Sequence, residues 1–369
     1  MDYNHQSPDW PHFTWNEKTL SLQLAGVRHR QGRLIGRMEG LGLLARTEAA
    51  LETLTREVVK SSEIEGEILS PDQVRSSIAR KLGMDISGLV PSDRRVDGVV
   101  EMTLDATGKF AEPLTAQRLF NWHSSLFSAK SAGLYKIKIG AWRDDANGPM
   151  QVVSGAMGNE KVHYEAPPAH RLDSEMKAFL DWENGKGALD PVLKAAVAHL
   201  WFVTIHPFDD GNGRIARAIA DRALARSENS PRRFYSMSAQ IRLERNAYYD
   251  ILEQTQKSSL DITDWLSWFL GCLDRAFTGA EASLASVLRK ERFWKEHSGT
   301  SINERQRLIL NKLMDDFTGK LTSTKWAKLT KCSQDTAHRD ILDLIERGIL
   351  VQDAGGGRST SYSLKSFDA

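Results

Sequence analysis

The segment from His206 to Arg217, HPFDDGNGRIAR, gathers residue types that can carry out phosphoryl or nucleotidyl transfer. Pro207 ends the preceding helix, because a proline pushes the residue before it out of the helical region. The Gly-Asn-Gly turn that follows lets backbone N–H groups converge where a new helix starts, and the helix dipole favours an anion there. Arg214 and Arg217 lie three residues apart, on one face of that helix, and can add charge-assisted contacts to a polyphosphate.

Two further side chains complete this chemistry. The imidazole of His206 has an unperturbed pKa of about 6.5, which suits the removal of a proton from an attacking hydroxyl at neutral pH. Asp210 would repel a phosphate unless a cation lay between them. A Mg²⁺ ion held by one carboxylate and by phosphate oxygens resolves that conflict. A base, a cation ligand, an anion cradle and two arginines together predict transfer from a nucleoside triphosphate.

Other interpretations of the same residues have weaker support. The run from Gly211 to Ala216 also fits the dinucleotide pattern GxGxxA, with Trp201–Ile205 as its strand, but no strand-helix alternation surrounds it. The spacing of His199, His206 and Asp210 could hold zinc, although neither HExxH nor a cysteine pair occurs. No Walker A sequence is present, which argues against a P-loop enzyme.

The same twelve residues resemble the signature of the Fic family, His-x-Phe-x-Asp/Glu-Gly-Asn-Gly-Arg-x-x-Arg, and fill every fixed position. The resemblance implies that His206 is the general base and that Asp210 holds Mg²⁺. It also implies that ATP is attacked at its α-phosphate and that pyrophosphate leaves. By the same resemblance, Gly211, Asn212 and Gly213 would form the anion hole for ATP. Arg214 would contact the β-phosphate and Arg217 the γ-phosphate.

An upstream segment, SSEIEG over residues 61–66, resembles the inhibitory motif of this family, Ser/Thr-x-x-x-Glu-Gly/Asn. Ser61 and Glu65 are four residues apart and therefore share one helix face. In relatives the glutamate pairs with the second arginine of the signature, here Arg217, and prevents productive γ-phosphate placement. The resemblance thus implies inhibition within one chain.

Two other segments have counterparts in the family. Residues 161–167, which include Val162 and His163, resemble the flap that aligns a target segment by strand addition. Tyr248 resembles the first tyrosine of a pair that lines the adenine pocket. Eight residues later Gln256 stands where some relatives have an asparagine against the nucleotide.

The periodicity predicts a mainly α-helical protein that positions these residues. We expect an N-terminal helical region over 1–95 and a catalytic core over 96–280, with a helix ending near Gly66 and a β-hairpin within 133–168. A linker over 281–300 and a winged helix-turn-helix over 301–369 follow, the latter with three helices and two strands around a glycine-rich turn.

Composition limits the setting in which this chemistry operates. The formal net charge is +1, so no global field recruits nucleic acid or a membrane. Two cysteines without a CxxC pair, and the lack of a signal peptide or an apolar run of membrane-spanning length, predict a soluble cytoplasmic protein without a membrane partner. The sequence is compatible with self-modification and with a homodimer, and the winged helix makes DNA a candidate partner.

These observations predict an autoinhibited protein adenylyltransferase that moves AMP from ATP to a Ser, Thr or Tyr hydroxyl of an unidentified target. Two alternatives use the same pocket. In the first, Glu65 orients a water that removes AMP from a modified protein. In the second, the chain is a DNA-binding regulator that only senses a nucleotide, with 333–339 at the start of its recognition helix.

Overall fold

The computed structural model describes residues 3–86, 88–127, 137–146, 148–155, 161–314, 317, 319–354 and 360–365. The protein is mainly helical, as the sequence predicts, and its described residues form two small antiparallel sheets. The chain divides into two compact units, Met1–Glu281 and Ala282–Ala369. None of the described helices combines the length and the apolar character that crossing a membrane requires.

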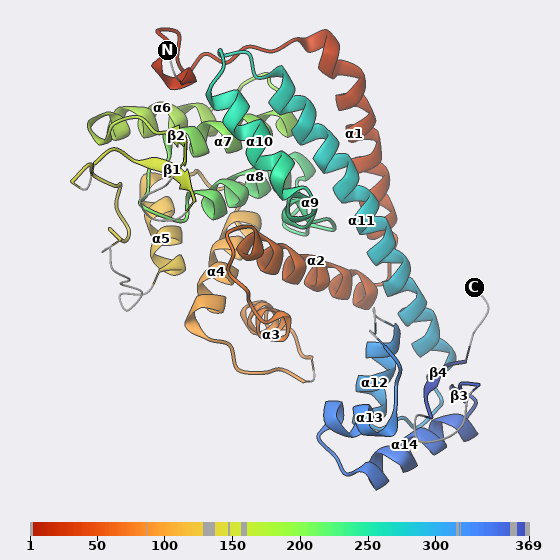
Figure 1. Ribbon diagram of the computed structural model, residues 1–369. Coiled ribbons are helices and arrows are strands. Elements are labelled where there is room, and N and C mark those ends of the chain that lie inside the picture. Colours follow the sequence, from red (N-terminus) through yellow and green to blue (C-terminus); the bar gives the residue numbers. More distant parts are fainter. Residues whose placement is uncertain are drawn as a thin grey trace. The chain divides into compact units, whose positions relative to one another are not determined.

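The described residues of the first unit form one β-hairpin, with helices before and after it in the sequence (Figure 1). The elements before the hairpin are η1 (Asn4–Gln6), α1 (Glu17–Glu39), α2 (Leu43–Ile64), α3 (Pro71–Lys81), α4 (Arg94–Gly108) and α5 (Ala116–Leu126). The strands are β1 (Gln151–Ser154) and β2 (Lys161–Glu165). After them come η2 (Ala169–Arg171), α6 (Leu172–Asn184), α7 (Pro191–Ile205), α8 (Asn212–Glu228), α9 (Met237–Leu243), α10 (Arg245–Gln256) and α11 (Thr263–Glu296).

Helices α7 and α8 pack against each other and carry between them the loop with the predicted chemistry (Figure 1). The start of α7 is well specified, because the Asp190 side chain accepts a hydrogen bond from the Val192 N–H and Pro191 occupies the first turn. Almost every residue of α7 is buried, so its apolar character on all sides is that of a core helix. The buried residues of α8 include several alanines, such as Ala216 and Ala220. The loop between the helices is therefore held on a rigid base.

Helix α2 ends beside the same loop. Its last residue is Ile64, and Gly66 adopts a φ of +83°, in the left-handed region that glycine enters without steric cost. The Glu67 N–H then donates to the Ser62 carbonyl and closes the helix end. The predicted helix end near Gly66 is confirmed, and it places Glu65 at the point where the chain leaves the helix.

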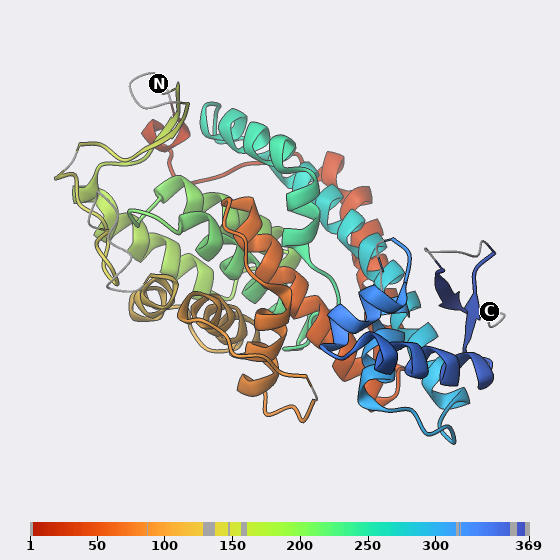
Figure 2. The same ribbon diagram turned by 60° about the horizontal axis from the view of Figure 1, so that its bottom comes forward.

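Helices α1 and α11 lie side by side in both views (Figure 1, Figure 2). Gln23 of α1 donates to the Ser267 carbonyl, and Arg30 pairs with Asp274 at 2.6 Å. We expected a linker over residues 281–300, but α11 continues without interruption to Glu296. The difference arises because this segment contains apolar residues at helical spacing and no glycine or proline before Gly299.

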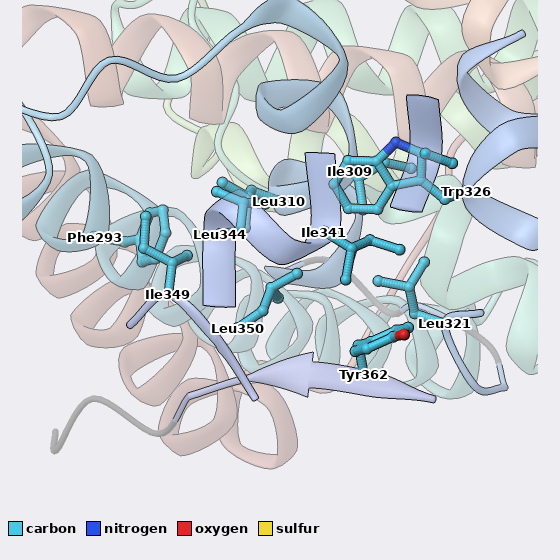
Figure 3. Packing of buried hydrophobic residues seen from close by; sticks show 11 residues of the cluster. Phe293, Ile309, Leu310, Leu321, Trp326, Ile341, Leu344, Ile349, Leu350 and Tyr362 are labelled. Atoms are coloured by element: carbon cyan, nitrogen blue, oxygen red, sulfur yellow. The ribbon is translucent and has the colours of Figure 1, made fainter. Parts of the chain in front are cut away.

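The second unit begins within α11, and its described residues then form three helices followed by a hairpin, in the order that the sequence predicts. Its elements are α12 (Glu304–Met314), α13 (Ser323–Thr330), α14 (Gln334–Glu346), β3 (Leu350–Gln352) and β4 (Tyr362–Leu364). Buried side chains from all three helices and both strands converge with Phe293 in one core (Figure 3). The glycine-rich turn at 355–357 lies outside the described residues, and the winged-helix assignment stays a prediction.

Candidate active site

His206 adopts an unusual backbone conformation at the end of α7. Its φ of 51° and ψ of 58° lie in the left-handed region, which costs a non-glycine residue about 1–3 kcal/mol. Its N–H still donates to the Phe202 carbonyl, so His206 closes the last turn of the helix. The chain then reverses through Pro207 towards α8, and the imidazole is left half-buried at this reversal.

The ring of His206 is oriented for proton acceptance. Its Nδ1 lies 3.1 Å from the Val203 carbonyl oxygen, an acceptor that requires the proton on Nδ1 and leaves the lone pair on Nε2. Burial, with a smaller contribution from the charge of Arg143, lowers the pKa of His206 to about 4, although the Val203 hydrogen bond opposes this shift. The ring is therefore neutral at pH 7 and available as a base.

This pKa predicts a specific titration. In the wild-type protein we expect the His206 ring to stay neutral from pH 8 down through pH 5.5 and to take up a proton only near pH 4. The sign follows from burial, which disfavours the charged imidazolium. The measurement is NMR of histidine-labelled protein, with the His206 signals assigned by their loss in His206→Ala. A midpoint of about 6.5, the value of a free histidine, would contradict this description of the site.

The loop after His206 is fixed by the side chain of Asn212. Its Oδ1 accepts the Phe208 N–H at 3.0 Å, and its Nδ2 donates to the Phe208 carbonyl at 2.7 Å. The Phe208 ring is fully buried and stacks on His123 at a centroid distance of 4.3 Å. The sequence predicted Asn212 in the anion hole. The structure shows that its amide clamps the loop, which leaves its backbone N–H at the helix start.

The beginning of α8 is suited to holding an anion. Gly211, with a φ of 81°, precedes the helix, and the Ile215 N–H makes the first helical bond to its carbonyl. The N–H groups of Asn212, Gly213 and Arg214 are among those that a helix leaves without an intrahelical partner at its N-terminus. A Cβ on Gly213 would meet the Glu65 Oε1 at 2.3 Å. The Glu65 carboxylate therefore occupies the space directly over this helix start, where the dipole favours an anion.

Arg217 is held by the inhibitory segment. Its Nη2 lies 2.8 Å from the Glu65 Oε1 and also donates to the Ser61 carbonyl at 2.9 Å, while its Nε donates to the Ser61 hydroxyl at 2.9 Å. The arginine side chain is 3% exposed, and the glutamate side chain is 32% exposed. Burial opposes the charged form of Arg217, but the neighbouring Glu65 carboxylate raises the arginine pKa above its usual value. The structure thus brings Ser61, Glu65 and Arg217 together.

Arg214 has a carboxylate partner of its own. Its Nη1 donates to the Glu67 Oε2 at 2.9 Å, and its guanidinium lies 5.2 Å from the centre of the Phe127 ring. The other Glu67 oxygen lies 3.8 Å from Arg95. Sequence reasoning missed Glu67. Its position two residues after Glu65, in the segment that leaves the helix, was the available signal.

Each of the two arginines keeps one buried donor that is not used. Within the described part of the chain, Nε of Arg214 and Nη1 of Arg217 are buried and make no hydrogen bond. A buried donor without an acceptor costs about 1–3 kcal/mol, and a charged donor costs more. Buried arginines outside this site, such as Arg222 and Arg233, also have unused donors, but those of Arg214 and Arg217 lie at the start of α8, where the oxygens of a polyphosphate could accept from them.

Tyr248 is buried in α10 close to this site. Its hydroxyl lies 2.8 Å from the His199 Nε2, and its ring packs against Tyr249 and Trp268. Burial lowers the pKa of His199 to about 3, so this histidine is neutral. Gln256, at the end of the same helix, donates weakly to the Thr204 hydroxyl at 3.4 Å. The predicted contact of Tyr248 with adenine stays a prediction.

The hairpin that contains Val162 and His163 is tied to α10. Its strands pair antiparallel, and the register shifts between Val152 and Val153, which leaves His163 as the extra residue of β2. The His163 ring lies 2.6 Å from Glu253 through Nδ1 and 2.6 Å from the Ser154 hydroxyl through Nε2. Val162 is exposed. The predicted role of this segment as a flap that aligns a target stays a prediction.

Asp210 is exposed at the rim of the loop, and its Oδ1 accepts the Gly211 N–H at 2.5 Å. No group of three or more His, Cys, Asp or Glu side chains converges to hold a metal in the part of the chain that the structure describes. One carboxylate completed by phosphate oxygens is nevertheless a sufficient donor set for Mg²⁺. Residues Trp201–Ile205 lie in α7, so the dinucleotide-fold interpretation, which required a strand there, is wrong.

Comparison with known proteins agrees with this geometry. Residues 113–224 match the Fic/DOC family, and residues 3–84 match a domain of unknown function, DUF4172. The chain is 35% identical over 130 residues to the protein adenylyltransferase Fic of Nematostella vectensis, which covers 34% of this chain and 28% of that protein. It is 25% identical over 267 residues to the protein adenylyltransferase Fic of Culex quinquefasciatus, with 70% and 49% covered. The chain thus spans less than half the length of these two relatives.

Two solved structures share the fold. A Fic family protein from Desulfovibrio desulfuricans G20 superposes with a TM-score of 0.53 at 20% identity, over 97% of this chain and 99% of that one. A Fic domain containing signaling protein from Bacteroides thetaiotaomicron gives a TM-score of 0.52 at 21% identity, over 70% and 96%.

Proposed function

We propose, for a chain whose central domain belongs to the Fic/DOC family, that it is an autoinhibited protein adenylyltransferase. It would transfer AMP from ATP to a Ser, Thr or Tyr hydroxyl of a protein and release pyrophosphate. The observation that carries the proposal is the pair of buried, unused donors on Arg214 and Arg217, beside a helix start that holds a carboxylate. This is a polyphosphate site with a neutral histidine next to it.

The chemistry needs one proton transfer and one displacement. Nε2 of His206 removes the proton of the attacking hydroxyl, whose oxygen forms a new bond to the α-phosphorus. The bond from that phosphorus to the bridging oxygen breaks, and pyrophosphate leaves with the electron pair. Arg214, Arg217 and the N–H groups at the start of α8 stabilise the negative charge on the phosphate oxygens. A Mg²⁺ held by Asp210 and the phosphates would neutralise part of that charge.

Autoinhibition would follow from the position of Glu65. Its carboxylate contacts Arg217 and lies over the N-terminus of α8, so a phosphate arriving there meets both an occupied arginine and a like charge. The glutamate is at a helix end and is 32% exposed, so it can be displaced without unfolding the core. Glu67 would also inhibit the reaction, because its carboxylate is paired with Arg214 and keeps that arginine from a phosphate.

Glu67→Gln is expected to add to the effect of Glu65→Gly. An Arg–carboxylate contact that is partly exposed contributes roughly 0.5–1 kcal/mol, so the double variant should incorporate AMP about two- to fivefold faster than Glu65→Gly. Glu67→Gln alone should change little, because Glu65 still occupies Arg217. The measurement is the initial rate of incorporation at several ATP concentrations. A double variant slower than Glu65→Gly would mean that Glu67 supports catalysis.

The experiment that tests the activity is incubation of Glu65→Gly with ATP, Mg²⁺ and cell lysate, followed by mass spectrometry of the proteins. We expect AMP on Ser, Thr or Tyr residues of a target or of the chain itself, and none with His206→Ala. A parallel incubation with a pre-modified protein scores released AMP. Release without incorporation would favour the AMP-removing enzyme, and the absence of both reactions, with ATP bound, would favour a nucleotide sensor.

A further inference from the structure

Arg143 is a buried arginine that lies between the catalytic loop and the hairpin. Its side chain is 0% exposed, and it belongs to the segment that precedes β1. Nε donates to the His206 carbonyl at 2.8 Å, Nη2 donates to the Pro167 carbonyl, and Nη1 pairs with Asp145 at 3.0 Å. Its backbone N–H donates to the Pro207 carbonyl at 2.9 Å. One residue thus binds two successive carbonyls of the loop and one beyond the hairpin.

These hydrogen bonds hold the backbone at His206, the residue of the site whose conformation is strained. The left-handed conformation of His206 is unfavourable by itself and persists only where the surroundings fix it. The two carbonyls that accept from Arg143 belong to His206 and to the next residue, so they set the direction of the peptide on the C-terminal side of the histidine. The third carbonyl, that of Pro167, belongs to the chain that leaves β2. The position of the base and the end of the hairpin are therefore linked through one guanidinium.

We propose that Arg143 is a positioning residue for the transfer reaction: it holds His206 in the left-handed turn that aims Nε2 at the attacking hydroxyl, and it ties that turn to the hairpin. The inference rests on the proposed function, because the reaction that needs this alignment is the one assigned to His206. Lysine cannot replace the arginine, since it lacks the planar fork that serves three acceptors in fixed directions. In the part of the chain that the structure describes, the hydrogen bonds and the ion pair of Arg143 involve neither Arg214 nor Arg217, so it acts through His206 and leaves ATP binding to the others.

The test compares Arg143→Lys with its parent, Glu65→Gly. Because a small misplacement of a reacting group can cost about 100-fold in rate, we expect kcat for AMP incorporation to fall about 10- to 100-fold while KM for ATP stays within about twofold. Arg118→Lys is the matched control. Arg118, whose side chain is 10% exposed, also donates to backbone carbonyls, but these belong to Asp105 and Lys109 at the end of α4 and not to the catalytic loop. The Arg118→Lys variant should have a lower melting temperature and the same kcat as its parent.

A second readout separates this inference from the proposed function. Histidine NMR of the same variants, without ATP, should show the His206 ring signals shifted or broadened in Arg143→Lys and unchanged in Arg118→Lys. If the parent transfers no AMP, the proposed function fails, and the NMR spectra alone decide whether Arg143 positions the ring. Unchanged His206 signals, or a folded Arg143→Lys protein with the kcat of its parent, would overturn the role of Arg143.

Discussion

His206→Ala, made in the Glu65→Gly background, should lower AMP incorporation by about 10²- to 10⁴-fold, the usual contribution of a positioned general base. His206 has the properties this role needs: a neutral ring, a protonated Nδ1 fixed on the Val203 carbonyl, and a free Nε2 at the reversal between α7 and α8. The Glu65→Gly background matters, because a wild-type enzyme that is already inhibited leaves little activity to lose.

The matched control for this loss is His29→Ala, which removes an exposed histidine from α1. We expect it to keep the rate of the parent. The fold of His206→Ala should survive, since the loop stays clamped by the Asn212 side chain and by the buried Phe208 ring. Thermal unfolding of both variants checks this point. Incorporation by a folded His206→Ala protein at the parental rate would exclude His206 as the base.

Glu65→Gly should raise AMP incorporation about 10- to 100-fold over the wild-type chain. A hydrogen bond to a charged partner contributes roughly 1.5–3 kcal/mol, and removing the carboxylate frees Arg217 together with the space over Gly213. ATP can then place its γ-phosphate on the arginine and its α-phosphate before His206. Arg217→Ala, added to Glu65→Gly, should lower the rate again, because the freed space no longer has its cation.

Glu63→Gly is the matched control for Glu65→Gly. Glu63 lies in the same last turn of α2, where it pairs with Lys60 and Arg242 instead of Arg217. A glycine there costs the helix about 1 kcal/mol but leaves the active-site arginine occupied, so incorporation should stay at the wild-type level. If Glu63→Gly activates as strongly as Glu65→Gly, loosening of the helix end is responsible and the ion pair is not. A Glu65→Gly enzyme that is slower than wild type, with ATP binding intact, would favour a supporting or AMP-removing role for Glu65.

Much of the site could be predicted because its residues are contiguous. From His206 to Arg217 one turn and one helix start fix the relative positions, and a proline and two glycines mark where they occur. The contact between Glu65 and Arg217 spans a long separation in the chain. It was accessible through a second motif whose helical spacing put Ser61 and Glu65 on one face, as the structure has them.

The remaining interactions depend on tertiary packing that no local pattern encodes. Arg143 meets the catalytic loop from a segment far away in the sequence and lies in no recognisable motif. Glu67 lies beside the inhibitory motif, but its pairing with Arg214 depends on how the end of α2 packs against α8. The tie between His163 and Glu253 depends on a bulge in β2, which shifts the register locally. The sequence could not show whether Asn212 fixes the loop through its side chain or contributes to the anion hole, because both roles suit an asparagine at a helix start.

The most direct test of the account is the origin of the transferred group. Glu65→Gly is incubated with Mg²⁺ and with ATP labelled either at the α-phosphate or at the γ-phosphate, and the label bound to protein is measured after acid precipitation. The account predicts that α-label is incorporated, that γ-label is released as pyrophosphate, and that Glu65→Gly/His206→Ala incorporates neither. Incorporation of γ-label, or α-label incorporation that does not depend on His206, would contradict AMP transfer by this site.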